Sequence, residues 1–226
     1  MRTANRPIRM TTLEYSEISA VSTANAHNPT ILNPDFLSNQ GVVPADWQVA
    51  ETFTTPPLSI VRYLNGVVFE ARPDKLIITE SVNNDRAATP QVFDLMKKYV
   101  VLLPYTPYIA AGLNCKVSVK TSHPAEAILK RFVLPEAISE CDITGVRLRV
   151  TTGCETDAKL FVEIDEGLLK RAEDDSNGEV IYSCNFHHDT FDTTEDLSQI
   201  LDNWGIYKPF LDEYIPKLYR STKGNK

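Results

Sequence analysis

Residues 58–80 read LSIVRYLNGVVFEARPDKLIITE, three apolar-rich segments separated by two turn signals. Asn65-Gly66 is the first signal, and it accepts at low cost the positive φ angles that both positions of a two-residue hairpin turn require. Pro73-Asp74 is the second. We therefore expect an antiparallel meander with strands over 58–64, 67–71 and 75–80.

Further strands are expected on both sides of this meander. A first strand over 12–23 changes its apolar phase partway, which indicates a bulge. The segment 108–121 is a long strand, because its apolar residues occupy the odd positions from Ile109 to Val119. A second meander follows at 146–150, 160–165 and 179–189. Its outward residues predict ion pairs across the ladder, with Arg147 and Arg149 opposite Glu163 and Asp165.

Helical periodicity and capping residues place helices between these strands. Asn33-Pro34 predicts a short helix that ends near Gly41, and Thr89-Pro90 predicts one that ends before Pro104. Others are expected from Pro124 to Pro135, after Asp192/Thr193, and from about Pro209, with a kink at Pro216. Residues 42–57 have three prolines and no period, so we expect a loop that packs against a surface.

The predicted elements repeat their order. Residues 12–103 and 108–219 each give a β-α-β-β-β-α-like half, with flexible tails at 1–11 and 220–226. The fold class is therefore α+β, with antiparallel sheet(s) from two such halves, joined in one pseudo-duplicated body, and helices packed on one face. This order resembles the tandem modules of bacterial effector-binding domains, although no motif of that family carries over. The resemblance implies a small-molecule cleft between the halves.

Composition narrows the classes of partner. The chain has 226 residues, with Lys+Arg 23 against Asp+Glu 30 and a formal net charge of −7. An acidic surface repels phosphate backbones and anionic lipid, so neither nucleic acid nor a membrane is expected as a partner. No apolar run has the length of a signal peptide or a membrane helix. The chain has only 4 cysteines and no Cys-x-x-Cys motif. We expect these cysteines to be reduced, which favours a cytoplasmic location.

No catalytic residue, metal site or cofactor is expected from motifs. The chain contains no Gly-x-Ser-x-Gly elbow and no phosphate-binding glycine loop. The sequence NFHHD at 185–189 is the densest polar group, but neighbouring strand residues point to opposite faces. His187 and His188 therefore cannot easily bind one metal ion.

Four residues are candidates for binding: Asn114, Asn185, His187 and Trp47. The first three would converge on a cleft if the even face of the 108–121 strand were one of its walls, and the alternative is a face that is simply wet. Trp47 could be an interface anchor or a core residue. We expect a non-catalytic binding protein that associates with a protein partner or with itself. The alternatives are a small-molecule sensor with a cleft between the halves and an uncharacterised hydrolase.

Overall fold

The computed structural model describes residues 12–121, 147–154, 156–167, 178–189 and 193–220. They form a nine-stranded sheet in the order β2-β3-β4-β5-β1-β6-β9-β8-β7, with every neighbouring pair antiparallel. The strands are β1 (Leu13–Ala24), β2 (Val49–Thr55), β3 (Leu58–Tyr63), β4 (Val67–Arg72), β5 (Lys75–Ser81), β6 (Tyr108–Thr121), β7 (Arg147–Gly153), β8 (Lys159–Gly167) and β9 (Gly178–His188). The helices are η1 (Pro29–Ile31), α1 (Pro34–Asn39), α2 (Asn84–Ala88), α3 (Val92–Leu102), α6 (Thr194–Asp202) and α7 (Trp204–Arg220). A mixed fold with a large antiparallel sheet is confirmed.

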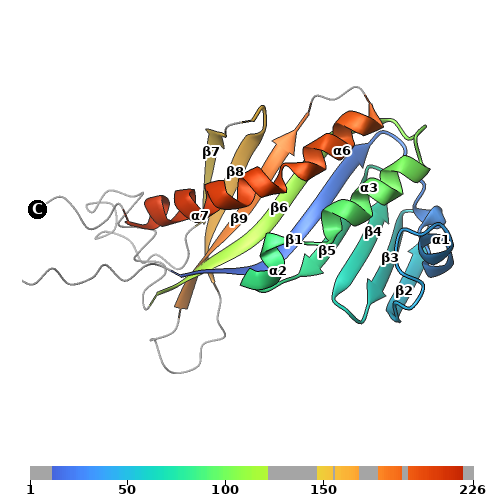
Figure 1. Ribbon diagram of the computed structural model, residues 1–226, viewed down its shortest axis with the longest axis horizontal. Helices are drawn as coiled ribbons and strands as arrows, with labels where there is room; N and C mark the ends of the chain where they lie inside the picture. Colours follow the sequence, from blue (N-terminus) through green and yellow to red (C-terminus); the bar gives the residue numbers. More distant parts are fainter. Residues whose placement is uncertain (1–11, 122–146, 155, 168–177, 190–192, 221–226) are drawn as a thin grey trace, which may run out of the picture.

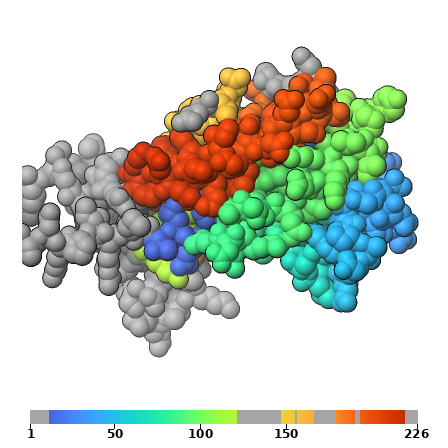
Figure 2. Space-filling model, viewed as in Figure 1, coloured from blue at the N-terminus to red at the C-terminus, as the bar shows by residue number. Residues whose placement is uncertain are grey.

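The helices cover one face of the sheet. Helices α3, α6 and α7 lie across the central strands in Figure 1, and in the same view of Figure 2 their atoms hide most of these strands. The core lies between the two layers, because alternate strand residues such as Leu113, Phe186 and Ile18 are buried there against helix residues such as Trp204 and Met96. We call the other side of the sheet the open face.

The first meander is confirmed, but its turn differs from the expected type. In the described residues only glycines have positive φ, and Gly66 (φ 88°) is the one in this turn. The Asn65 side chain instead accepts a hydrogen bond of 3.1 Å from the backbone N–H of Val67. A local Asx contact therefore stabilises the turn, and only one of its positions needs the left-handed conformation.

The expectation of a loop over residues 42–57 is wrong in part, because Val49–Thr55 forms the edge strand β2. The pairing with β3 runs from Val49↔Tyr63 to Thr55↔Leu58. The strand has no apolar alternation because six of its seven residues are exposed. The sequence signal for this strand was therefore only its content of the β-forming residues Thr and Phe, because neither side of the strand is buried.

The start of helix α3 also differs from the expected position. Helix α3 begins at Val92, and Gln91 rather than Thr89 is its cap residue. The cap comes from another element: buried Glu80 on β5 accepts a 2.8 Å hydrogen bond from the backbone N–H of Gln91 and pairs with Arg86. A carboxylate at a helix N-terminus satisfies free N–H groups and interacts favourably with the helix dipole.

The last two helices are only partly as expected. Thr193 caps α6 through a capping box with Asp196, as expected. The final helix begins at Trp204 rather than near Pro209, and it contains both Pro209 and Pro216. Helix α2 was not expected at all. Its N-cap is Asn83, whose side chain accepts from the backbone N–H of Arg86.

Side chains from the C-terminal helices tie them to the N-terminal part of the chain. The indole N–H of Trp204 donates to the backbone oxygen of Ala87 at 2.8 Å, and its ring packs on Phe93 with centroids 5.4 Å apart. Lys97 on α3 forms an ion pair with Asp202 on α6. The first and second parts of the chain therefore share one core.

The remaining expectations concern the first strand, the long strand over 108–121 and segments that the structure does not describe. The bulge in the first strand is confirmed by the register shift between Tyr15 and Glu17 opposite β6. Ile109 is an exception to the buried odd positions of β6, since it is 45% exposed. The expected helix between Pro124 and Pro135, the tail at 1–11 and residues 221–226 of the second tail lie outside the described residues. Arg220, the first residue of the expected 220–226 tail, is instead the last residue of helix α7.

Candidate functional site

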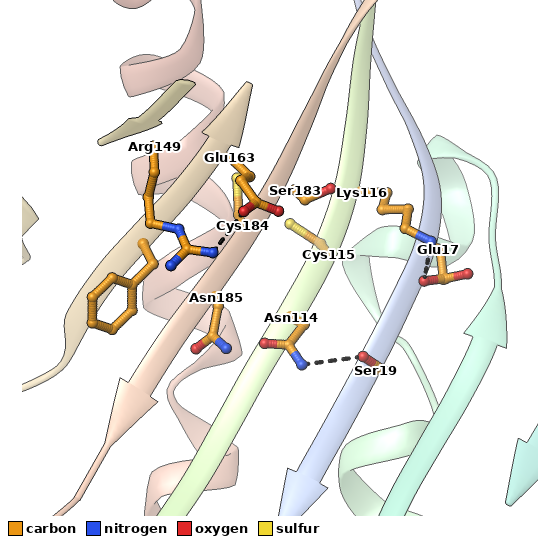
Figure 3. Close-up of a pocket in the computed structure, with 11 residues that line it drawn as sticks. Glu17, Ser19, Asn114, Cys115, Lys116, Arg149, Glu163, Ser183, Cys184 and Asn185 are labelled. Atoms are coloured by element: carbon orange, nitrogen blue, oxygen red, sulfur yellow. Dashed lines mark hydrogen bonds and ion pairs between the residues drawn. The ribbon is translucent and has the colours of Figure 1, made fainter. Parts of the chain in front are cut away.

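Four polar or aromatic residues form a row across the open face. The register pairs Ser19 with Asn114, Asn114 with Asn185, and Asn185 with Phe161, on β1, β6, β9 and β8 respectively. Residues opposite one another on neighbouring strands project from the same face, so these side chains are neighbours. Figure 3 shows the two asparagines side by side. The register therefore places Asn114 and Asn185 on one face, whereas the choice between a ligand cleft and a wet face stays a prediction.

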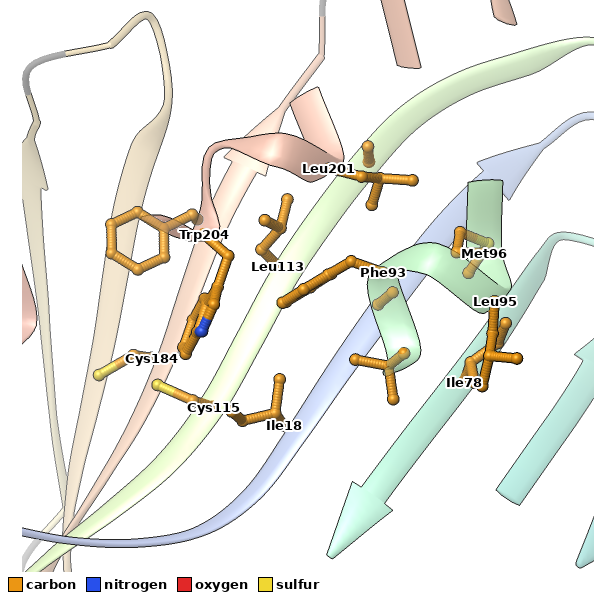
Figure 4. Packing of buried hydrophobic residues seen from close by; sticks show 14 of the residues in the cluster. Ile18, Ile78, Phe93, Leu95, Met96, Leu113, Cys115, Cys184, Leu201 and Trp204 are labelled. Carbon is orange, nitrogen blue, oxygen red and sulfur yellow. The ribbon is translucent and has the colours of Figure 1, made fainter. Parts of the chain in front are cut away.

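A hollow of about 450 Å³ lies over this row. Its floor includes the backbone of Cys115 and Cys184, whose side chains are buried in the core on the opposite face (Figure 4). The remaining lining residues are Glu17, Ser19, Asn114, Lys116, Arg149, Phe161, Glu163, Ser183 and Asn185. Residues of β1 and β6 to β9 thus meet in one concave, partly apolar site.

The two asparagines are incompletely hydrogen-bonded. Among the described residues, the buried Oδ1 atoms of Asn114 and Asn185 have no hydrogen-bond partner, and Asn114 makes one bond there, from Nδ2 to the Ser19 hydroxyl at 3.3 Å. Both oxygens point toward Gly112, because a Cβ built there would lie 3.5 Å from the first and 3.7 Å from the second. A buried acceptor without a donor costs about 1–3 kcal/mol, so these groups need an explanation.

Ion pairs flank the row. Nζ of Lys116 lies 2.9 Å from Oε1 of Glu17, and a guanidinium nitrogen of Arg149 lies 2.6 Å from Oε1 of Glu163. The second pair was expected from the sequence, as was Arg147 with Asp165 at 2.7 Å, and both are confirmed. The charges around the hollow therefore cancel locally.

His187 and Trp47 lie outside the lining of this hollow. His187 is on the same face, one row away, where it pairs with Gly112 and Lys159 and its ring meets the edge of Phe161 at 6.1 Å between centroids. Trp47 packs against Tyr63 near the β3 end of the sheet, with ring centroids 5.1 Å apart.

His188 points to the helix face and belongs to a separate network. Its Nε2 lies 2.8 Å from the hydroxyl of Tyr207, which also lies 2.8 Å from the hydroxyl of Thr156. Burial lowers the pKa of His188, and the neighbouring His187 lowers it further. Burial also lowers the pKa of His27, which lies near Tyr108. Both rings are therefore favoured in the neutral form.

A second hollow, of about 570 Å³, lies beside the start of β1 and includes Asn84. In contrast to the open-face asparagines, Asn84 is fully used: Oδ1 accepts from the Tyr15 N–H at 2.8 Å, and Nδ2 donates to the Leu13 oxygen at 2.9 Å. This amide supports structure. The open-face hollow is the better candidate because its amides have unused capacity.

The sequence did not single out Ser19, Phe161, Lys116 or Arg149 as site residues. Their placement depends on the order of strands in the sheet, which brings β1 beside β6 and β8 beside β9. Only strand alternation could have signalled that they occupy one face.

Neither a family model nor a curated protein matches this chain. Among the described residues no group of three or more His, Cys, Asp or Glu is placed to hold a metal ion. In that same part of the chain no helix has the length and apolar character needed to cross a membrane.

Proposed function

We propose that this chain is a non-catalytic binding protein and that a small ligand occupies the open-face hollow. The observation that carries the proposal is the pair Asn114 and Asn185, directly opposed on neighbouring strands and each with a buried oxygen that finds no donor in the part of the chain that the structure describes. Functional sites are where a fold retains polar groups that its own packing does not satisfy. Rotation of each carboxamide about its last side-chain torsion would turn its oxygen from Gly112 toward the hollow, where a ligand could bond to it.

The charged residues of the hollow favour binding over turnover. Glu17 and Glu163 could be acid or base groups, but each already pairs with a cation in the same row. A carboxylate that is held in place by a cation still has lone pairs that can accept hydrogen bonds from a ligand. Ion-paired carboxylates are better suited to holding a polar ligand in place.

Ligand-observed NMR with a fragment library that contains neutral, charged and aromatic compounds tests this proposal. We expect hits that disappear with Asn114→Leu/Asn185→Leu and remain with Asn39→Leu. Asn39 is a matched control, because it allows the same substitution at an exposed residue at the end of helix α1, outside the sheet and the lining of the hollow. Hits that are equally strong in all three proteins, or no hits at all, would refute the proposal.

A second candidate function is association with a protein through the β2 edge. Strand β2 ends the sheet, six of its seven residues are exposed, and Phe53 is 49% exposed. An unpaired edge presents free backbone groups to another strand. We propose a second copy of this chain as the occupant, since identical edges can pair antiparallel about a two-fold axis.

Size-exclusion chromatography with light scattering tests the edge. We expect a dimer that Phe53→Lys shifts toward monomer, because a charge on an edge strand opposes pairing. The control is Tyr105→Lys, which adds the same charge at a residue that is 99% exposed and outside the sheet. A monomer at all concentrations, or a dimer unaffected by Phe53→Lys, would contradict this role. Binding to a different protein instead would replace self-association by a heterologous partner.

The duplicated architecture is also part of the proposal. In each part of the chain the last strand of the meander returns to pair with the first strand: β5 with β1, and β9 with β6. The central pair β1 and β6 would then be the junction of two like-ordered halves, 12–103 and 108–219. Strand β2 and helix α2 are additions to the first half.

We propose a cytoplasmic location as well. Cys115, Cys154 and Cys184 are all free thiols, and such thiols persist in a reducing compartment. Fractionation of the source cells tests this, and recovery in a secreted fraction would contradict it.

A further inference from the structure

We infer that the open-face hollow takes a neutral saccharide, held by the two asparagine amides against the ring of Phe161. This inference rests on the proposed function and names the ligand class for the same site. Three properties of the hollow support it: its unused hydrogen-bonding groups, its balanced charge and its aromatic wall.

The carboxamide groups of the two asparagines favour a ligand that both donates and accepts hydrogen bonds. The Oδ1 atoms of Asn114 and Asn185 lie over Gly112, which is outside the lining of the hollow, and have no donor among the described residues. Rotation of a carboxamide about its last side-chain torsion exchanges Oδ1 with Nδ2, so each residue can present either an oxygen or an N–H₂ group to the hollow. A hydroxyl donates one hydrogen bond and accepts two, so it fits either orientation. Adjacent hydroxyls of one sugar ring match two adjacent amides.

The two ion pairs of the hollow favour a neutral ligand. Lys116 with Glu17 and Arg149 with Glu163 bring two positive and two negative groups to the hollow, and all four are paired. A charged ligand would have to break one of these pairs or remain uncompensated beside it, and an unpaired charge in a partly buried site is costly. Hydroxyl groups can bond to paired carboxylates and cations without disturbing them.

The aromatic wall calls for an apolar surface on the same ligand. Phe161 lies directly opposite Asn185 and lines the hollow. A sugar ring has hydroxyls at its rim and a face of C–H groups that can pack on an aromatic ring. A purely apolar ligand would leave the amides unpaired, and a small polar molecule such as urea would leave the ring uncovered.

The size is also suitable. Ligand sites in proteins have volumes of about 300–1,000 Å³, and the hollow measures about 450 Å³. One or two sugar rings are therefore a better match than a long chain. Because the site is open to one side, we expect weak binding, with Kd on the order of 1 mM.

The test follows the side-chain amide signals of Asn114 and Asn185 in ¹⁵N-resolved NMR spectra of the full chain, assigned with the single Asn→Leu variants. The neutral probes are the methyl glycosides of glucose, galactose, mannose and N-acetylglucosamine, together with maltose and cellobiose. Glucuronate and glucosamine are the charged probes. Benzyl alcohol represents the aromatic contact alone, and urea represents the hydrogen bonds to the amides alone.

We expect at least one neutral glycoside to shift both amide signals saturably, and the charged analogue to bind about tenfold more weakly or worse. Phe161→Leu should weaken the same titration while the amide signals of the free protein remain near their original positions. Asn39→Leu, the control on helix α1, should leave it unchanged.

The remaining outcomes overturn the inference in different ways. If only charged or aromatic fragments shift the two amides, the saccharide class is wrong and the binding function stands. If glycosides shift other signals but not these two, the site is wrong. If no compound in the wider fragment library perturbs the hollow, the proposed function fails with it.

Discussion

Replacing Asn185 by Leu should make the protein more stable while removing its ligand site. The Oδ1 atom of Asn185 is buried and has no donor within the described ranges of the chain. Leucine has a similar shape, no polar atom to desolvate and a higher preference for strands, so every term favours the variant on folding. Polar-to-apolar changes inside a well-satisfied structure have the opposite effect.

The size of the effect follows from the unpaired atom. Removing an unsatisfied buried acceptor recovers about 1–3 kcal/mol, and the partial exposure of Asn185 puts the expected gain at the lower end of this range. We expect the free energy of unfolding to rise by about 1 kcal/mol, which raises Tm by about 2–4 °C in a protein of this size. Asn114→Leu should gain less, because it also loses the 3.3 Å bond to Ser19.

Urea unfolding followed by fluorescence measures the change. The matched control is Asn84→Leu, the same substitution at an amide whose oxygen and nitrogen both have backbone partners. Its loss strands a backbone N–H and a carbonyl oxygen, so the free energy of unfolding should fall by about 1–3 kcal/mol. If Asn185→Leu were destabilising by a similar amount, its oxygen must have a donor in the native protein, and the argument for a vacant site would be refuted.

Three further outcomes are expected. Burial lowers the pKa values of His27 and His188 in the folded protein, so the unfolded chain takes up protons first as the pH falls below about 6.5. The free energy of unfolding should therefore be flat above that pH and decrease below it. Urea titrations from about pH 5 to about pH 8 measure this profile, and a flat profile over the whole range would contradict the expectation. Glu80→Gln removes the charge that caps α3, so calorimetry should show stability lower by about 2 kcal/mol, and a neutral result would mean that the carboxylate contributes no net stability. Trp204→Phe retains an aromatic ring, although a smaller one, and removes the N–H that donates to the Ala87 oxygen at 2.8 Å; a loss of at least about 1–2 kcal/mol is expected, and a retained Tm would show that this bond is dispensable.

Local signals predicted the meanders well because hairpins depend on near neighbours. The turn at Asn65-Gly66 and the ladder with Arg147 opposite Asp165 both follow from residues close in sequence. Strand β2 was missed because it buries almost nothing, so it lacks the alternation that a half-buried strand shows. The α3 boundary was missed because its cap is a carboxylate from β5, a long-range contact that no local motif encodes.

The candidate site was predictable only in part. Strand alternation placed Asn114 on the polar side of its strand, and Asn185 with His187 on one face of theirs. It could not show that β6 and β9 are neighbours in a register that sets Asn114 opposite Asn185, since pairing of distant strands is decided by the whole core. Phe161 and Ser19 enter the site for the same reason, from β8 and β1.

This dependence links the site to the stability of the fold. The two asparagines alternate with core residues, so Leu113, Cys115 and Phe186 fix the strands on one side while the amides remain unsatisfied on the other. Burial of the apolar side holds the register, because a shift by one residue would bring the asparagines into the core and expose these side chains. The cost of two unpaired oxygens is small beside that constraint, so the core can hold an incompletely bonded pair in place. A ligand then requires only rotation of the two carboxamide ends on strands that are already held in register, so little ordering entropy opposes its binding.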